Sequence, residues 1–115
     1  QAFTRNDRTN DETYAIWIRN RVEADEEFSN FSADDLMAKQ ITGVTLKERL
    51  LYEIKYHSET GEHLDLENVT LCNASRDSGG LVPYVNWSRG YRRLCVDSCH
   101  SLDRNVSLRA RQAVA

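Results

Sequence analysis

The sequence has no apolar run that approaches the ~18 residues of a membrane-spanning helix. It therefore predicts no insertion into a membrane. No charged and then apolar leader opens the chain, so we expect no signal peptide, and the residues leave the compartment undetermined. The length of 115 residues fits a single domain, 1–115, with a modest core and without a large enclosed active site.

Cysteine is scarce and odd in number, with Cys72, Cys95 and Cys99. A closed disulfide framework would leave one of them unpaired. Cys95, Cys99 and His100 invite a zinc site completed by Cys72, but the spacing differs from the usual C-x-x-C pair and no second compact pair exists. The acidic connector 62–67 offers His, Asp and Glu at alternate positions, again without a nearby pair. We expect no metal site and no cofactor.

The sequence also lacks the short motifs that accompany common types of catalysis. It has no phosphate-binding loop, no G-x-G-x-x-G and no H-E-x-x-H. Cys95 or Cys99 with Asp97 and His100 is the one cluster that offers a nucleophile, an acid and a base. These residues follow one another at a strand end, where successive side chains point to opposite faces and rarely meet at one reacting atom. We therefore expect no enzymatic activity.

Lysine and glutamate are absent after Glu67, although the chain has nine Glu and three Lys before or at that residue. The later charged side chains are Arg and Asp only, with Arg in excess. The N-terminal half is thus acidic and the C-terminal half basic, while the net charge of −3 is mild. This division fits either separate solvated faces or a patch that faces a partner, and both interpretations stay open.

The residues up to Glu67 have mainly a helical pattern. Capping-box sequences that begin at Thr9, Ser32 and Thr45 predict three helix starts. The expected helices run from near Asn10 to about 28, from 32 to 40, and from 46 to 60. Gly61 is well placed as the C-cap of the third helix. Residues 1–67 are therefore predicted to form a mainly helical scaffold.

After residue 67 the pattern changes to short strands. β-Branched and aromatic residues between turn residues predict strands at 68–72, 82–87, 91–98 and 106–114. A short loop, Ser88-Arg89-Gly90, joins the second and third strands, and Gly90 is expected to supply the positive φ of the hairpin turn. The whole pattern predicts an α+β domain, with about three N-terminal helices followed by a small antiparallel sheet in 68–115.

The stretch 81–107 shows a strict alternation. Val85 and Trp87, then Leu94 and Val96, recur at every second position, as in a half-buried hairpin. These four residues form the framework of the hairpin, and Trp87, Leu94 and Val96 are predicted to be buried together with Leu108. The positions between them share no chemistry and are predicted to form an exposed ligand-binding face. With flanking positions, the candidate site consists of Arg76, Leu81, Tyr84, Asn86, Ser88, Arg89, Tyr91, Arg93, Cys95, Asp97, Cys99 and His100.

Nucleic-acid binding by an Arg- and Tyr-rich sheet face is an alternative function. Aromatic side chains would stack on bases, and arginines would contact phosphates. Against this, aspartates interleave with the arginines, and no RNP-type signature is present. The residues that would form such a surface are Arg76, Arg89, Arg92, Arg93, Arg104, Tyr84, Tyr91 and Trp87.

Four segments within residues 46–115 carry a resemblance to a known family: LKERLLYEIKYHSETGEHLDLENVTLCNASRDSGG, VPYVNW, LCV and LRARQAV. Together they resemble the small variable proteins of diversity-generating retroelements. In that family a reverse transcriptase copies a template with errors at adenines and writes the copy into the 3′ end of the target gene. The resemblance implies a C-type-lectin-like fold, and in so short a chain a reduced or divergent version of it and a different α+β scaffold both stay open. Residues 1–45 carry no such resemblance.

The residue types of 81–107 agree with this resemblance. Randomised adenines in an AAC or AAT codon yield Asn, Ser, Tyr, His, Asp, Cys, Arg, Gly and Leu, among others, but not Lys, Glu, Gln, Met or Trp. The non-framework positions contain only permitted types, and Trp87 occupies a framework position. We therefore expect a hypervariable face at about 76–107 that binds an unidentified protein or other macromolecule. Surface display is implied by the family alone.

Overall fold

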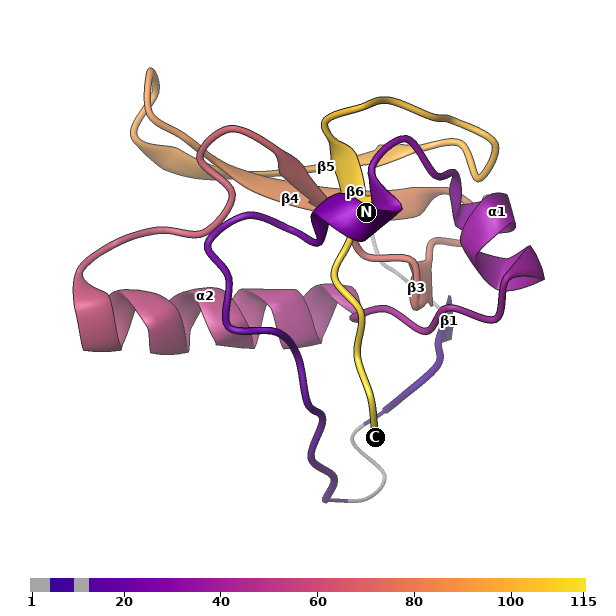
Figure 1. Ribbon diagram of the computed structural model, residues 1–115, viewed down its shortest axis with the longest axis horizontal. Coiled ribbons are helices and arrows are strands. Elements are labelled where there is room, and N and C mark those ends of the chain that lie inside the picture. The colour runs from indigo at the N-terminus through magenta and orange to yellow at the C-terminus, as the bar shows by residue number, and fades with distance from the viewer. Residues whose placement is uncertain (1–4, 10–12) are drawn as a thin grey trace.

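The computed structural model describes residues 5–9 and 13–115 of the chain (Figure 1). Its strands are β1 (Arg5–Asn6), β2 (Val69–Leu71), β3 (Ser75–Arg76), β4 (Val82–Ser88), β5 (Arg93–Cys99) and β6 (Leu108–Ala110). The main sheet has four strands in the order β5-β4-β2-β6. β4 pairs antiparallel with both β2 and β5, whereas β2 and β6 run parallel. A separate small sheet joins β1 and β3.

The helical segments are the 3₁₀ helix η1 (Glu26–Phe28) and the α-helices α1 (Ala33–Ala38) and α2 (Leu46–Thr60). Both α-helices begin with a capping box, in which the Ser32 or Thr45 hydroxyl accepts a backbone N–H and an acidic side chain three residues later caps in return. α2 ends at Gly61, which has a φ of 73° and donates its N–H to the His57 carbonyl. The helix predicted over 46–60 is therefore confirmed.

The prediction of about three N-terminal helices is wrong. The expected start of the first helix near Asn10 lies outside the described residues, and the residues from 13 to η1 are extended or irregular. Ile16 and Ile18 pack partly buried against the core, while Trp17 between them is 77% exposed. Trp17 also exchanges two backbone hydrogen bonds with Val114, at 2.7 and 2.9 Å. Pairing with a distant segment therefore outweighs the helical spacing of this stretch.

The main sheet has a hydrophobic core on each side. On one side α2 runs along the sheet (Figure 1), and Val85 packs in a cluster with Leu50 of this helix. On the other side Leu71 and Leu108 pack with Leu36 of α1. In the described part of the chain, α1 covers this second side at the end of the hairpin that holds Val82 and Cys99, and η1 contacts β6 (Figure 1). The loop end of the β4–β5 hairpin therefore has no helix over its second side.

The last strand differs from the expectation of a purely antiparallel sheet. β6 is shorter than the predicted 106–114 and lies parallel to β2. Beyond β6 the chain leaves the sheet, and Gln112 bridges Gly43. A Cβ at Gly43 would collide with the side-chain amide of Asn73, so a larger residue at Gly43 would have to displace this amide. The fold is mixed α+β. Long-range pairings of this kind hold segments that lie between its strands and helices.

Candidate functional site

The β4–β5 hairpin sorts its side chains by register. Three facing pairs share the side away from α2: Tyr84 with Asp97, Asn86 with Cys95, and Ser88 with Arg93. We call these six residues the hairpin face. The alternate pairs, Val85 with Val96 and Trp87 with Leu94, point to the α2 side. The structure thus brings six of the candidate residues together on one side of two adjacent strands.

The hairpin face is anchored at one end and open at the other. Tyr84 packs partly buried against the core beside α1. Burial, followed by neighbouring acidic groups that include Asp97 and Asp103, raises the pKa of Tyr84 above the usual tyrosine value. Arg93 and Asp97 are exposed, and the remaining members are partly buried among their strand neighbours.

The hairpin loop extends the face beyond the sheet, at the upper left of Figure 1. Arg89, Tyr91 and Arg92 are exposed, and Tyr91 is 77% accessible. The Arg93 guanidinium lies 5.1 Å from the centre of the Tyr91 ring, within cation–π range. The predicted positive φ at Gly90 is wrong, because the left-handed residue is Arg92, with a φ of 52°. The loop spans four residues between β4 and β5, so the left-handed position comes last.

The other candidate residues lie apart from the hairpin face. Leu81 precedes β4 and is partly buried, and His100 follows β5 and is exposed. Cys99 ends β5 and packs against the core beside α1. Arg76 on β3 is only 8% exposed, and its guanidinium donates to two backbone carbonyls of its own loop at 2.7 and 2.9 Å. Burial, followed by the nearby charge of Arg5, lowers the pKa of Arg76 below the usual arginine value.

The predicted framework residues are buried to different degrees. Leu108 is 7% exposed, as predicted, whereas Trp87 and Leu94 are only partly buried. The prediction that Val96 is buried is wrong, because it is 46% exposed. β5 is the edge strand of the sheet, and α2 packs against β4 instead. On the α2 side of the hairpin, the side chains of β4 are therefore more deeply buried than those of β5.

The three cysteines are free thiols. Burial raises the pKa of Cys72 to about 12 and that of Cys99 to about 11. A raised pKa leaves little thiolate near neutral pH, and the thiolate is the nucleophilic and metal-binding form. Cys95 and Cys99 stand on the same side of β5 but lie in different surroundings, one on the hairpin face and one against the core.

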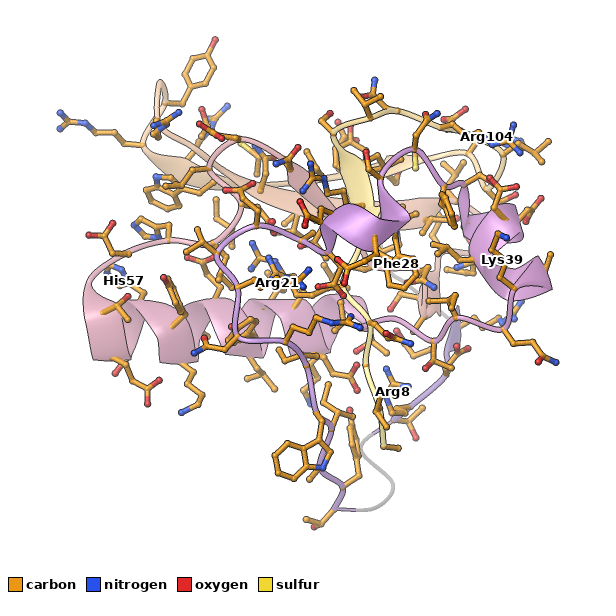
Figure 2. All side chains as sticks on the ribbon, in the orientation of Figure 1. Arg8, Arg21, Phe28, Lys39, His57 and Arg104 are labelled. Carbon is orange, nitrogen blue, oxygen red and sulfur yellow. The ribbon has the colours of Figure 1, made fainter. Side chains whose placement is uncertain are left out.

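A stack of three rings fastens the loop end of β4 to α2. The Trp87 ring lies 3.4 Å from the ring of His63, centre to centre, with an angle of 4° between the planes. His63 in turn stacks on His57, near the C-terminal end of α2 (Figure 2), at 4.4 Å. Nδ1 of His63 lies 2.7 Å from a carboxylate oxygen of Glu53. These contacts hold Trp87 on the α2 side of the hairpin, where the ring of His63 covers one face of its indole ring.

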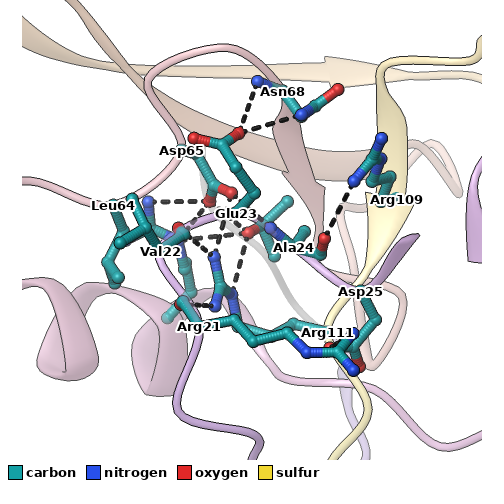
Figure 3. Close-up of polar contacts among 12 residues, drawn as sticks. Arg21, Val22, Glu23, Ala24, Asp25, Leu64, Asp65, Asn68, Arg109 and Arg111 are labelled. Atoms are coloured by element: carbon teal, nitrogen blue, oxygen red, sulfur yellow. Dashed lines mark hydrogen bonds and ion pairs between the residues drawn. The ribbon is translucent and has the colours of Figure 1, made fainter. Parts of the chain in front are cut away.

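A buried charge network joins α2, the sheet and the C-terminal segment. Its centre is Asp65, whose carboxylate lies 3.0 Å from Arg49 and 2.9 Å from Arg111, with all three side chains fully buried. The hydroxyl of Thr70 and the N–H of Ala24 also donate to Asp65. Figure 3 shows Arg111 beside Asp65 of the connector and beside the segment 21–25, where it donates to the carbonyls of Arg21 and Val22. The backbone carbonyl of Asp65 also accepts the Trp87 N–H at 3.1 Å, which ties the network to β4.

Sequence reasoning missed this network. Arg49 and Glu53 are spaced like an ordinary solvated helix pair, yet they are 0% and 6% exposed and lie 3.1 Å apart. The connector 62–67, weighed above as a metal loop, supplies Asp65 as a counter-ion for two arginines. The sequence carries no local signal for it, because α2 exposes Leu51 and Ile54 by 54% and 65% while it buries Arg49 and Glu53.

Within residues 5–9 and 13–115, no group of three or more His, Cys, Asp or Glu side chains is arranged to hold a metal ion. None of the helices in that part of the chain is long and apolar enough to cross a membrane. Comparisons of the chain with protein-family models, with curated proteins and with solved structures found no match. The arrangement that remains to be explained is a rigid hairpin with chemically mixed side chains on its open side.

Proposed function

We propose that this protein binds a macromolecular ligand, without catalysis, through the hairpin face and the adjoining loop 89–92. We further propose that a diversity-generating retroelement varies these positions by mutagenesis at adenines. The observation that carries the proposal is the register of β4 and β5. It places six chemically unrelated side chains on one side of the hairpin and the alternate residues of the same strands on the side that packs toward α2. Such a separation allows the ligand-binding residues to change while the core stays constant.

The contacts of the hairpin face support this separation. No described partner forms a side-chain hydrogen bond with Asn86, and the Cys95 thiol approaches only the carbonyl of Arg93, at 3.9 Å. Arg93 contacts Tyr91 of the adjoining loop. All residue types on the face are reachable from an Asn codon by change at adenines. Exposed Tyr and Arg are also the side chains that give most energy to protein interfaces.

The nucleic-acid alternative retains the loop arginines and Tyr91, but it loses several of the residues on which it depended. Arg76 is buried, and Trp87 is stacked on His63. Arg104, beside α1 in Figure 2, holds Asp35 through two hydrogen bonds of 2.7 Å. A continuous stacking and phosphate-binding surface is therefore not available on this side of the sheet.

Sequencing the DNA that flanks the gene tests the proposed function. We expect a reverse transcriptase gene and a near-copy of the 3′ end of this gene, with adenines in the codons that correspond to the hairpin face and loop. Adenines that are instead spread equally over the codons for Val85, Trp87 and Leu94 would contradict the proposal, as would flanks that hold neither feature.

A further inference from the structure

We propose that the ligand of the hairpin face is a protein that presents acidic groups to the hairpin loop and a basic group to the other end of the face. This inference rests on the proposed function and adds the chemistry of the partner. It follows from the distribution of charge along the hairpin, where positive charge gathers at one end and negative charge at the other.

The positive end is the hairpin loop. Arg89, Arg92 and Arg93 are exposed, and none of them pairs with an acidic side chain of the described residues. Most other arginines of this part of the chain are engaged, as Arg104 is with Asp35 and Arg8 with Glu48. Each of these three guanidinium groups lacks an acidic partner and offers a fork of donors that fits a carboxylate or a phosphate, so the loop attracts an anionic group.

The negative end lies where the hairpin meets α1. Asp97 and Asp103 are exposed, Asp97 faces Tyr84 across the hairpin, and both carboxylates contribute to the raised pKa of Tyr84. Asp97 accepts the backbone N–H of Ser98 at 2.8 Å and also hydrogen-bonds to the side chain of Tyr84, and Asp103 accepts the backbone N–H of His100 at 2.9 Å. No lysine or arginine within the described ranges forms an ion pair with either carboxylate.

The distance between the two ends decides which class of partner fits. Arg93 and Asp97 are four residues apart on β5, which corresponds to about 13 Å. This exceeds the screening length of about 8 Å at physiological ionic strength, so a ligand feels each end separately. A polyphosphate chain laid along the face is attracted by the loop and repelled by the aspartates. A protein surface carries both signs of charge and can complement both ends.

Two synthetic peptides of identical composition test this inference at low ionic strength. One carries a block of glutamates, a flexible spacer and a block of lysines, and the other alternates the two residues. A short single-stranded oligonucleotide is the third probe, and binding is measured by fluorescence anisotropy. We expect the block peptide to bind about fivefold or more tightly than the alternating peptide, and more tightly than the oligonucleotide.

Charge variants give the signature of two separate ends. The double variant Arg92→Glu, Arg93→Glu should weaken binding of the block peptide about tenfold. The double variant Asp97→Asn, Asp103→Asn should weaken the block peptide several-fold and strengthen the oligonucleotide. Lys55→Glu is the matched control. Lys55 lies on α2, on the other side of the sheet, and its replacement changes the charge by the same amount as one of the arginine substitutions. It should leave all affinities within about twofold.

Three results would overturn the inference. Equal affinity for the two peptides would show that the arrangement of charge is not recognised. Tighter binding of the oligonucleotide, unaffected by the aspartate substitutions, would favour a nucleic-acid ligand. The absence of binding by all three probes would show that charge does not select the ligand. In each case the proposed function stands or falls separately, by the sequence of the DNA that flanks the gene.

Discussion

Replacement of Asp65 by alanine is expected to lower the free energy of unfolding by about 3–5 kcal/mol, which is a large part of the stability of an ordinary small domain. Arg49 and Arg111 are both fully buried, and their carboxylate contacts at 3.0 and 2.9 Å are made to Asp65. Removal of this carboxylate leaves two guanidinium groups in the interior with too little negative charge to balance them. Denaturation with urea, followed by circular dichroism, measures the change.

Glu67→Ala is the matched control for this substitution. Glu67 lies two residues further along the same connector, and its side chain is exposed. Its replacement should change the free energy of unfolding by less than about 0.5 kcal/mol. If Asp65→Ala cost no more than Glu67→Ala, the network would not be the structural centre that the contacts indicate.

An aspartate placed at Val85 is expected to destabilise the domain by about 4 kcal/mol or more, whereas the same residue at Asn86 should cost less than about 1 kcal/mol. Val85 is 0% exposed and packs between Cys72 and α2, so a carboxylate there would be buried without a partner. Asn86 is its neighbour in β4, but its side chain lies on the opposite side of the strand, on the hairpin face.

The two variants introduce the same group one residue apart, so they compare the two sides of a single strand. Denaturant midpoints and near-ultraviolet circular dichroism give the comparison. A large loss of stability in Asn86→Asp would mean that the hairpin face is part of the core. Equal, small losses in both variants would mean that β4 does not separate a constant side from a changeable one.

The parts of the fold that were predictable from the sequence are those specified by local signals. The helix over 46–60 is set by its capping box at Thr45 and by Gly61, and both ends follow from side-chain and backbone chemistry within a few residues. The hairpin of 82–99 follows from the alternation of apolar residues, which sets its two sides. The six positions of the hairpin face were found because this alternation has a strict period.

The parts that could not be predicted depend on residues far apart in the chain. The stretch around Trp17 has helical spacing, but it is held extended by Val114. Arg49 and Arg111 look like surface residues until Asp65 is placed between them, and only the fold does this. Arg92 takes the left-handed position because of the length of the loop, although Gly90 is the residue that usually does so.

The division of roles in this fold supports a changeable face on a constant scaffold. The scaffold side of β4 is held by the cluster around Val85, by the stack of Trp87 on His63, and by the hydrogen bond from Trp87 to Asp65. None of these contacts uses a side chain of the hairpin face. Substitution at Asn86, Ser88 or Cys95 therefore leaves these contacts in place, whereas Tyr84 packs against the core.

Variation among copies of this gene from related sources tests the central claim most directly. Each position is scored for the number of different residues that it carries across the copies. The account predicts that variation concentrates at the hairpin face and loop 89–92, while Val85, Trp87, Asp65 and Arg111 stay constant. Variation spread evenly along the chain, or equal at Val85 and Asn86, would contradict it.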